Sequence, residues 1–159
     1  MRITEAQLEH QYQSAKREGW IPDFSDAGYG VSAEVLMGVA SRETNMQNII
    51  GDRGHGHGIM QIDDRSFPHW CATQKWRDVG EGIKMGAFVL RSKYNDAQTR
   101  GVPKEDLLKV ALASYNAGRN PVTDDLHGVD PDRHTTGHDY YHDVMRRALV
   151  FKRLLQSDQ

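Results

Sequence analysis

SRETNMQNIIGDRGHGHGIMQID (41–63) joins the end of a predicted helix to a glycine-rich loop and a short predicted strand. Ser32 can cap that helix, which we expect over 33–43 with Leu36 on its apolar face. Four glycines in 51–58 indicate a loop whose backbone can approach a ligand closely. This stretch therefore predicts helix, loop and strand in succession, with a small hairpin near 57–63.

Glu43 is the residue of this helix that does not fit a packing role. It follows Leu36 by seven positions, almost two helical turns, so it lies on the same apolar face. A carboxyl group held against apolar side chains resists ionisation and can deliver a proton near neutral pH. The simpler interpretation is a carboxylate at a fraying helix end that turns into water beside Arg42. Helix position alone leaves both open.

The residues after the glycines add further carboxylates. In a strand over 59–63, Gln61 and Asp63 would form a polar row, opposite Met60 and Ile62 on the packed side. Asp64 would then face away from Asp63, and strand parity decides which of the two meets a ligand. One protonated and one ionised carboxyl group are what cleavage of a glycosidic bond requires.

Outward from this centre the chain alternates helices and loops. Thr4 and Gln7 form a capping box for a helix that ends before Gly19. Further helices are expected over 79–94, over 104–116 and after Asp139, with a polar loop over 121–136 between the last two. No βαβ alternation, repeat or low-complexity segment interrupts this pattern. The prediction is a mainly α protein with one catalytic domain over 1–159.

Composition and charge argue against nucleic acid and membrane partners. The 22 acidic and 20 basic side chains give a formal charge of −2, which argues against a protein held on nucleic acid. The longest apolar stretch, VLMGVA (35–40), is too short for a membrane span. Cys71 stands alone, and the first twenty residues contain no apolar core of a secretory signal. We expect a monomer that is made in the cytoplasm.

A second polar group occurs in ASYNAG (113–118), at the end of a predicted helix. Tyr115 and Asn116 can offer a phenol and an amide to a sugar ring carrying an acetamido group. The alternative is an ordinary helix end closed by Asn116 and Gly118.

Histidines raise a competing metal hypothesis. His55 and His57 form an H-x-H pair that can bind zinc with Asp52 or Asp63, and His138 and His142 are one helical turn apart. The sequence contains no H-E-x-x-H motif and no matching second pair. We therefore expect no metal and no cofactor.

Taken together, four segments carry a family resemblance. SRETN (41–45), GDRGHGHGIMQID (51–63), ASYNAG (113–118) and TTGHDYYHDVMRRA (135–148) resemble, in the same order, goose-type lysozymes and the related lytic transglycosylases. The resemblance covers about 32–150, and the TTG-x-DY element favours the goose-type branch. It implies a lysozyme-like helical domain with a small β-hairpin beside a cleft.

The resemblance also implies an activity and a set of roles. The activity is cleavage of the β-1,4 bond between N-acetylmuramic acid and N-acetylglucosamine in the glycan strands of peptidoglycan. Glu43 matches the general acid, and Asp52 and Asp63 match positions that place the attacking water. The residues that match sugar-binding positions are Gln61, Tyr115, Asn116 and Tyr140.

The resemblance leaves alternatives to hydrolysis open. Because both aspartates are present, we favour a hydrolase over a lytic transglycosylase, which would leave 1,6-anhydromuramic ends. A non-catalytic glycan-binding module is the alternative from another class. The vertebrate cysteines are absent, which suggests a microbial or phage-borne protein, such as an endolysin or a secreted effector. Such a protein would act on the cell wall after release, and its further partners could include an inhibitor or immunity protein.

Overall fold

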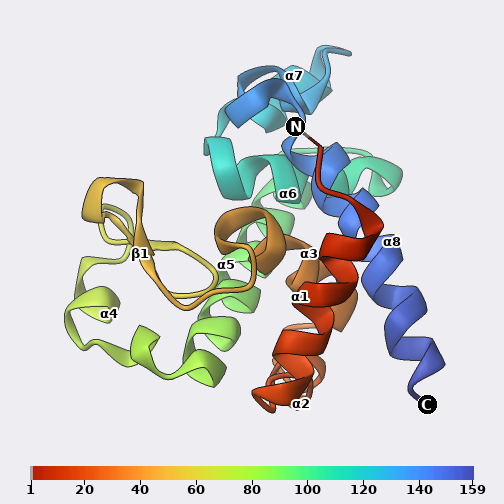
Figure 1. Ribbon diagram of the computed structural model, residues 1–159. Helices are drawn as coiled ribbons and strands as arrows, with labels where there is room; N and C mark the ends of the chain where they lie inside the picture. Colours follow the sequence, from red (N-terminus) through yellow and green to blue (C-terminus); the bar gives the residue numbers. More distant parts are fainter. Residues whose placement is uncertain (1) are drawn as a thin grey trace. The chain divides into compact units, whose positions relative to one another are not determined.

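The computed structural model describes residues 2–159 (Figure 1). It divides into two compact units. The first unit comprises the chain through Ala87 together with Arg146–Gln159, and the second comprises Phe88–Met145. The boundaries fall within two helices, α5 (Val79–Thr99) and α8 (Tyr140–Ser157). The prediction of one catalytic domain over 1–159 stays a prediction.

Four helices and a small sheet belong wholly to the first unit. The helices are α1 (Glu5–Arg17), α2 (Ile21–Ser25), α3 (Ala33–Thr44) and α4 (Pro68–Ala72), with a 3-10 turn, η2 (Lys75–Arg77), before α5. The strands β1 (Ile50–Gly51), β2 (Gly56–His57) and β3 (Ile62–Asp63) pair antiparallel in the order β1-β2-β3. A 3-10 turn, η1 (Asp52–Gly54), connects β1 and β2. The mainly helical class with a small β element is confirmed.

Local sequence signals account for the first helices. The Thr4 hydroxyl accepts a hydrogen bond from the Gln7 backbone, and the Gln7 side chain accepts one from the Thr4 backbone, so the capping box is confirmed. In α3, the predicted inner face is fully buried at Leu36 and its neighbours one turn later. The helix ends at Thr44 and is capped by Asn45, whose φ of 53° is left-handed.

The strand expected over 59–63 is shorter than predicted. Only Ile62 and Asp63 pair in β3, because Gln61 has a φ of 53° and closes a turn with Gly58. Ile59 and Met60 are both fully buried, so the expected alternation of polar and packed faces is wrong at Ile59. The turn removes the pleat on which that alternation depended.

The second unit is entirely helical in its regular structure. It contains parts of α5 and α8, the helices α6 (Leu107–Ala117) and α7 (Asn120–Leu126), and the 3-10 turns η3 (Lys104–Asp106), η4 (Pro131–His134) and η5 (Thr136–His138). Its buried cluster consists of Ala97, Val102, Leu107, Val110 and Val122, with Tyr94 packed against it.

Helix α7 corrects the prediction of a polar loop over 121–136. Pro121 occupies the first turn of α7, where a missing backbone N–H costs nothing, and Val122 enters the buried cluster. Because the segment is mostly polar, its composition did not indicate that Val122 packs in the buried cluster. Among residues 2–159, no helix is long and apolar enough to cross a bilayer.

Candidate active site

Glu43 lies one residue before the end of α3, in the first unit, and is half-buried. One contact fixes the loop that follows to this helix end, and a second joins two parts of the loop to each other. The Thr44 hydroxyl donates to the Ile59 carbonyl at 2.9 Å, and the Asn48 carboxamide oxygen accepts from the Ile59 backbone N–H at 2.9 Å. The proposed acid therefore stands at a helix terminus that is anchored to the glycine-rich loop.

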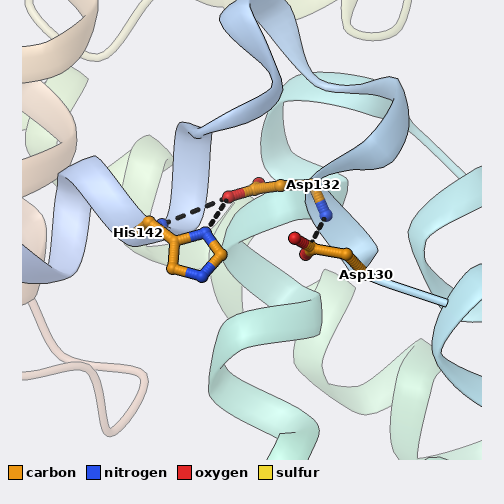
Figure 2. A group of neighbouring side chains, drawn as sticks. All are labelled: Asp130, Asp132 and His142. Atoms are coloured by element: carbon orange, nitrogen blue, oxygen red, sulfur yellow. Dashed lines mark hydrogen bonds and ion pairs between the residues drawn. The ribbon is translucent and has the colours of Figure 1, made fainter. Parts of the chain in front are cut away.

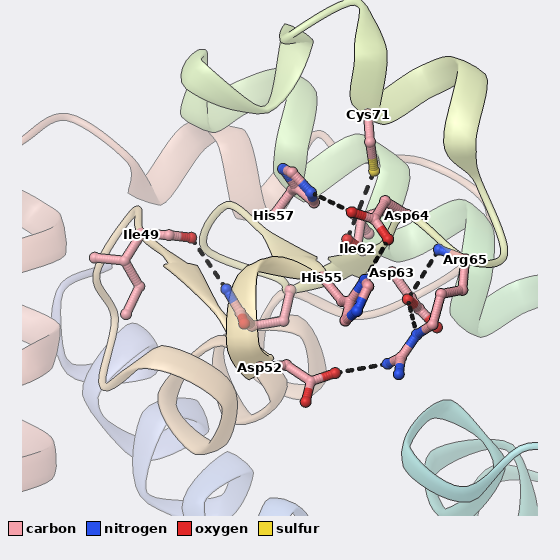
Figure 3. Close-up of polar contacts among 10 residues, drawn as sticks. Ile49, Asp52, His55, His57, Ile62, Asp63, Asp64, Arg65 and Cys71 are labelled. Atoms are coloured by element: carbon pink, nitrogen blue, oxygen red, sulfur yellow. Dashed lines mark hydrogen bonds and ion pairs between the residues drawn. The ribbon is translucent and has the colours of Figure 1, made fainter.

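Asp52 and Asp63 are brought together by a residue that the sequence analysis did not single out. Arg65 contacts Asp52 Oδ2 through Nη2 at 2.6 Å and Asp63 Oδ1 through Nε at 2.9 Å (Figure 3). The three side chains are 38–59% exposed. Asp52 begins η1 and Asp63 ends β3, so the sheet and its connecting turn position both carboxylates.

Asp64 points elsewhere. Its two oxygens lie 2.8 Å from His55 Nδ1 and 3.1 Å from His57 Nε2 (Figure 3). These hydrogen bonds, that of His55 first, hold the pKa of the Asp64 carboxyl below its ordinary value of 3.8. The two neighbours thus make separate contacts: Asp63 shares Arg65 with Asp52, whereas Asp64 binds the histidines.

Gln61 precedes β3, and its carboxamide group forms hydrogen bonds with the backbone of the loop. Its Nε2 donates to the Ile49 carbonyl at 3.0 Å and to the Gly58 carbonyl at 2.9 Å. Its Oε1 occupies the space where side chains at Gly51 and Gly56 would stand. The two glycines therefore make room for Gln61, which braces the loop, and its role toward sugar stays a prediction.

The remaining candidates belong to the second unit. Tyr115 is half-buried near the end of α6. The Asn116 carboxamide accepts from the Thr136 backbone at 2.9 Å and donates to the Thr136 hydroxyl at 3.3 Å, which ties the YNAG and TTG elements together. Tyr140 is 1% exposed, at the start of α8, so its ring packs inside the structure.

Neither histidine pair is arranged as the metal hypothesis supposed. His55 and His57 face Asp64 rather than Asp52 or Asp63, and His138 Nδ1 lies 2.8 Å from the Arg133 carbonyl.

A different group does have the spacing of metal ligands. Within residues 2–159, ligand atoms of Asp130, Asp132 and His142 all lie within 4.8 Å of one another (Figure 2). The fully buried Asp132 carboxylate accepts from the backbone N–H groups of Tyr141 and His142 and contacts His142 Nδ1 at 2.8 Å. These bonds explain the group as a cap on the first turn of α8.

Arg65 is the functional candidate that the sequence analysis missed. Periodicity does not reveal an exposed arginine in a loop. The available signal was local: a base directly follows the acidic pair in DDR (63–65), where it can return to either carboxylate. Its reach to Asp52, thirteen residues away, depends on the antiparallel sheet.

Comparisons with known proteins show which family the chain resembles. Residues 23–154 match the family model described as lysozyme g. The chain is 33% identical over 129 residues to lysozyme G of Dromaius novaehollandiae and to lysozyme g of Casuarius casuarius, covering 77% of this chain. It is 29% identical over 155 residues to lysozyme g of Takifugu rubripes, covering 89% of this chain and 78% of that protein.

The first two relatives are longer, and the chain spans 59% and 65% of their lengths. The relatives are vertebrate proteins, so they lend no support to a microbial or phage origin. Because the family model matches most of its length, the chain belongs to the goose-type lysozyme family.

Proposed function

We propose that this protein is a muramidase that hydrolyses the β-1,4 bond between N-acetylmuramic acid and N-acetylglucosamine in peptidoglycan. Membership of the goose-type lysozyme family supports the reaction class. The observation that carries the proposal is the set of carboxylates on one anchored framework, with half-buried Glu43 at the end of α3 and Asp52 and Asp63 in the segment that follows.

In this proposal Glu43 is the general acid. Its carboxyl proton passes to the glycosidic oxygen as the bond from the anomeric carbon to that oxygen breaks. This step requires that the carboxyl group carries its proton when the glycosidic bond breaks. The leaving sugar departs with a neutral hydroxyl group.

In this proposal Asp52 and Asp63 guide the water that attacks the anomeric carbon. A carboxylate that accepts a proton from water directs the water oxygen to the anomeric carbon, and the product then has a reducing end. Without a held water, the substrate's own hydroxyl group closes the ring and leaves an anhydro end. The aspartate pair therefore favours hydrolysis over the lytic transglycosylase alternative.

Glu43→Gln tests the assignment of the acid. We expect turnover of purified peptidoglycan to fall at least about a hundredfold, because the amide cannot protonate the leaving oxygen. Glu34→Gln, at the other end of α3, is the matched control and should retain activity. The measurement is mass spectrometry of released fragments, with the unfolding midpoint checked in parallel.

The outcomes of this experiment distinguish the proposed function from its alternatives. Full activity in Glu43→Gln would remove Glu43 from the mechanism. Wild-type protein that binds peptidoglycan and releases no fragments would instead indicate a glycan-binding module. Reducing ends identify hydrolysis, and anhydro ends identify transglycosylation.

The place of action follows from the substrate. We propose that the protein reaches the cell wall after synthesis in the cytoplasm, and that an inhibitor or immunity protein is a further candidate partner. Detection of the protein in cell-wall fractions would test the first point. A microbial or phage source, as an endolysin or effector, likewise stays a prediction.

A further inference from the structure

We infer that Arg65 is a positioning residue that holds Asp52 and Asp63 together and so commits the reaction to water. This inference rests on the proposed function, in which the two aspartates guide the attacking water. It concerns the guanidinium group that joins them and assigns it no contact with the reacting atoms.

The contacts with Arg65 use one oxygen of each carboxylate. Asp63 Oδ1 accepts from both the side-chain Nε and the backbone N–H of Arg65, at 2.9 and 3.0 Å. Asp52 uses Oδ2 toward Nη2 at 2.6 Å. Asp63 Oδ2 and Asp52 Oδ1 take no part in these three bonds. One oxygen of each aspartate therefore fixes orientation, and the other can accept from water.

A cation is needed at this place because the aspartates share one charge sign. Two neighbouring carboxylates repel each other unless a positive group lies between them. Their framework also needs support, since Asp52 and Arg53 have φ values of 49° and 56° in a loop rich in glycine. The planar fork of an arginine bonds two carboxylates at fixed angles, whereas a lysine ammonium group can contact both but does not fix those angles.

A purely structural role for Arg65 would leave the ratio of anhydro to reducing ends unchanged when Arg65 is replaced. Exposed ion pairs contribute little to stability, and the Arg65 side chain is 58% exposed. Loss of Arg65 should then leave the unfolding midpoint nearly unchanged, whichever role is correct. The two roles differ in the products, because only a positioning role alters whether water or the substrate's hydroxyl group completes the reaction.

The experiment compares Arg65→Gln, Arg65→Lys and the charge-matched control Arg17→Gln, an exposed residue in the last turn of α1. For Arg65→Gln we expect kcat to fall about 10- to 100-fold with little change in KM, because a misplaced group slows chemistry more than binding. The fraction of anhydro ends should rise several-fold. Arg65→Lys should keep part of the wild-type kcat and part of the wild-type preference for reducing ends. Arg17→Gln should match wild type in kcat and in its products.

The ratio of anhydro to reducing ends is measured per cleaved bond, so it does not depend on how much protein is folded. In an Asp63→Asn background, Arg65→Gln should add little further change, because the two residues act together. A kcat and end ratio within about twofold of wild type in Arg65→Gln would overturn the inference. Full activity in Glu43→Gln would instead overturn the proposed function, so the two failures are distinguishable.

Discussion

Thr44 donates its hydroxyl hydrogen bond to the carbonyl of Ile59 at 2.9 Å, and both residues are almost completely buried. The bond joins the residue directly after the proposed acid to the loop that carries the aspartates. The same hydroxyl group lies 2.9 Å from the Ala40 carbonyl, so the end of α3 and the loop share one donor. The position of Glu43 relative to its loop therefore depends on a side chain that does no chemistry.

Thr44→Val should weaken both the fold and the activity. Valine keeps the shape but leaves the Ile59 carbonyl without its donor, which costs about 1–3 kcal/mol in the free energy of unfolding. Denaturant unfolding measures this loss, and kcat should fall as the helix end loosens. Thr73→Val, whose hydroxyl group is exposed, is the control and should change neither. Equal effects of the two substitutions would contradict this role for Thr44.

Gly56→Ala tests the way in which Gln61 fills the loop. A methyl group at Gly56 would overlap the Gln61 carboxamide oxygen, so the Gln61 side chain must leave the Ile49 and Gly58 carbonyls. We expect a loss of about 1–3 kcal/mol for Gly56→Ala and for Gln61→Ala singly. The double variant should lose clearly less than the sum, because the overlap no longer exists. Additive losses in urea unfolding would show that the two positions are independent.

Helical features were predictable where local sequence determines them. The Thr4–Gln7 capping box and the buried face around Leu36 depend on spacings of three and four residues, which the structure keeps. The backbone conformation at Gln61 was mispredicted because a left-handed turn replaced the expected strand. Arg65 was missed because its contact with Asp52 requires three strands to pair first. Residues that depend on tertiary pairing leave no periodic signal in the sequence.

Asp64→Asn should change the pH dependence of stability. In the folded protein the pKa of Asp64 is lowered, so its contribution is present above 3.8 and is lost as the pH falls through its folded value. The variant should therefore unfold at a lower temperature than wild type near about pH 7, and the two should converge as the pH falls below the folded pKa of Asp64. Glu18→Gln, an exposed change of the same charge at the end of α1, should show no such convergence. A constant difference across the pH range would contradict the assignment.

Cys71 should be unreactive until the protein unfolds. The thiol is 5% exposed and donates to the Ile62 carbonyl at 3.7 Å, and burial first, then Asp64 and Asp63, raise its pKa to about 11. At about pH 8 only on the order of one thiol in a thousand is then ionised, and the thiolate is the reactive form. A thiol-specific disulfide reagent should label the native protein at least about a hundredfold more slowly than the protein in denaturant. Rapid labelling of native protein would mean that α4, which carries Cys71, separates readily from β3, and Asp63 at the end of β3 would then lack a fixed position.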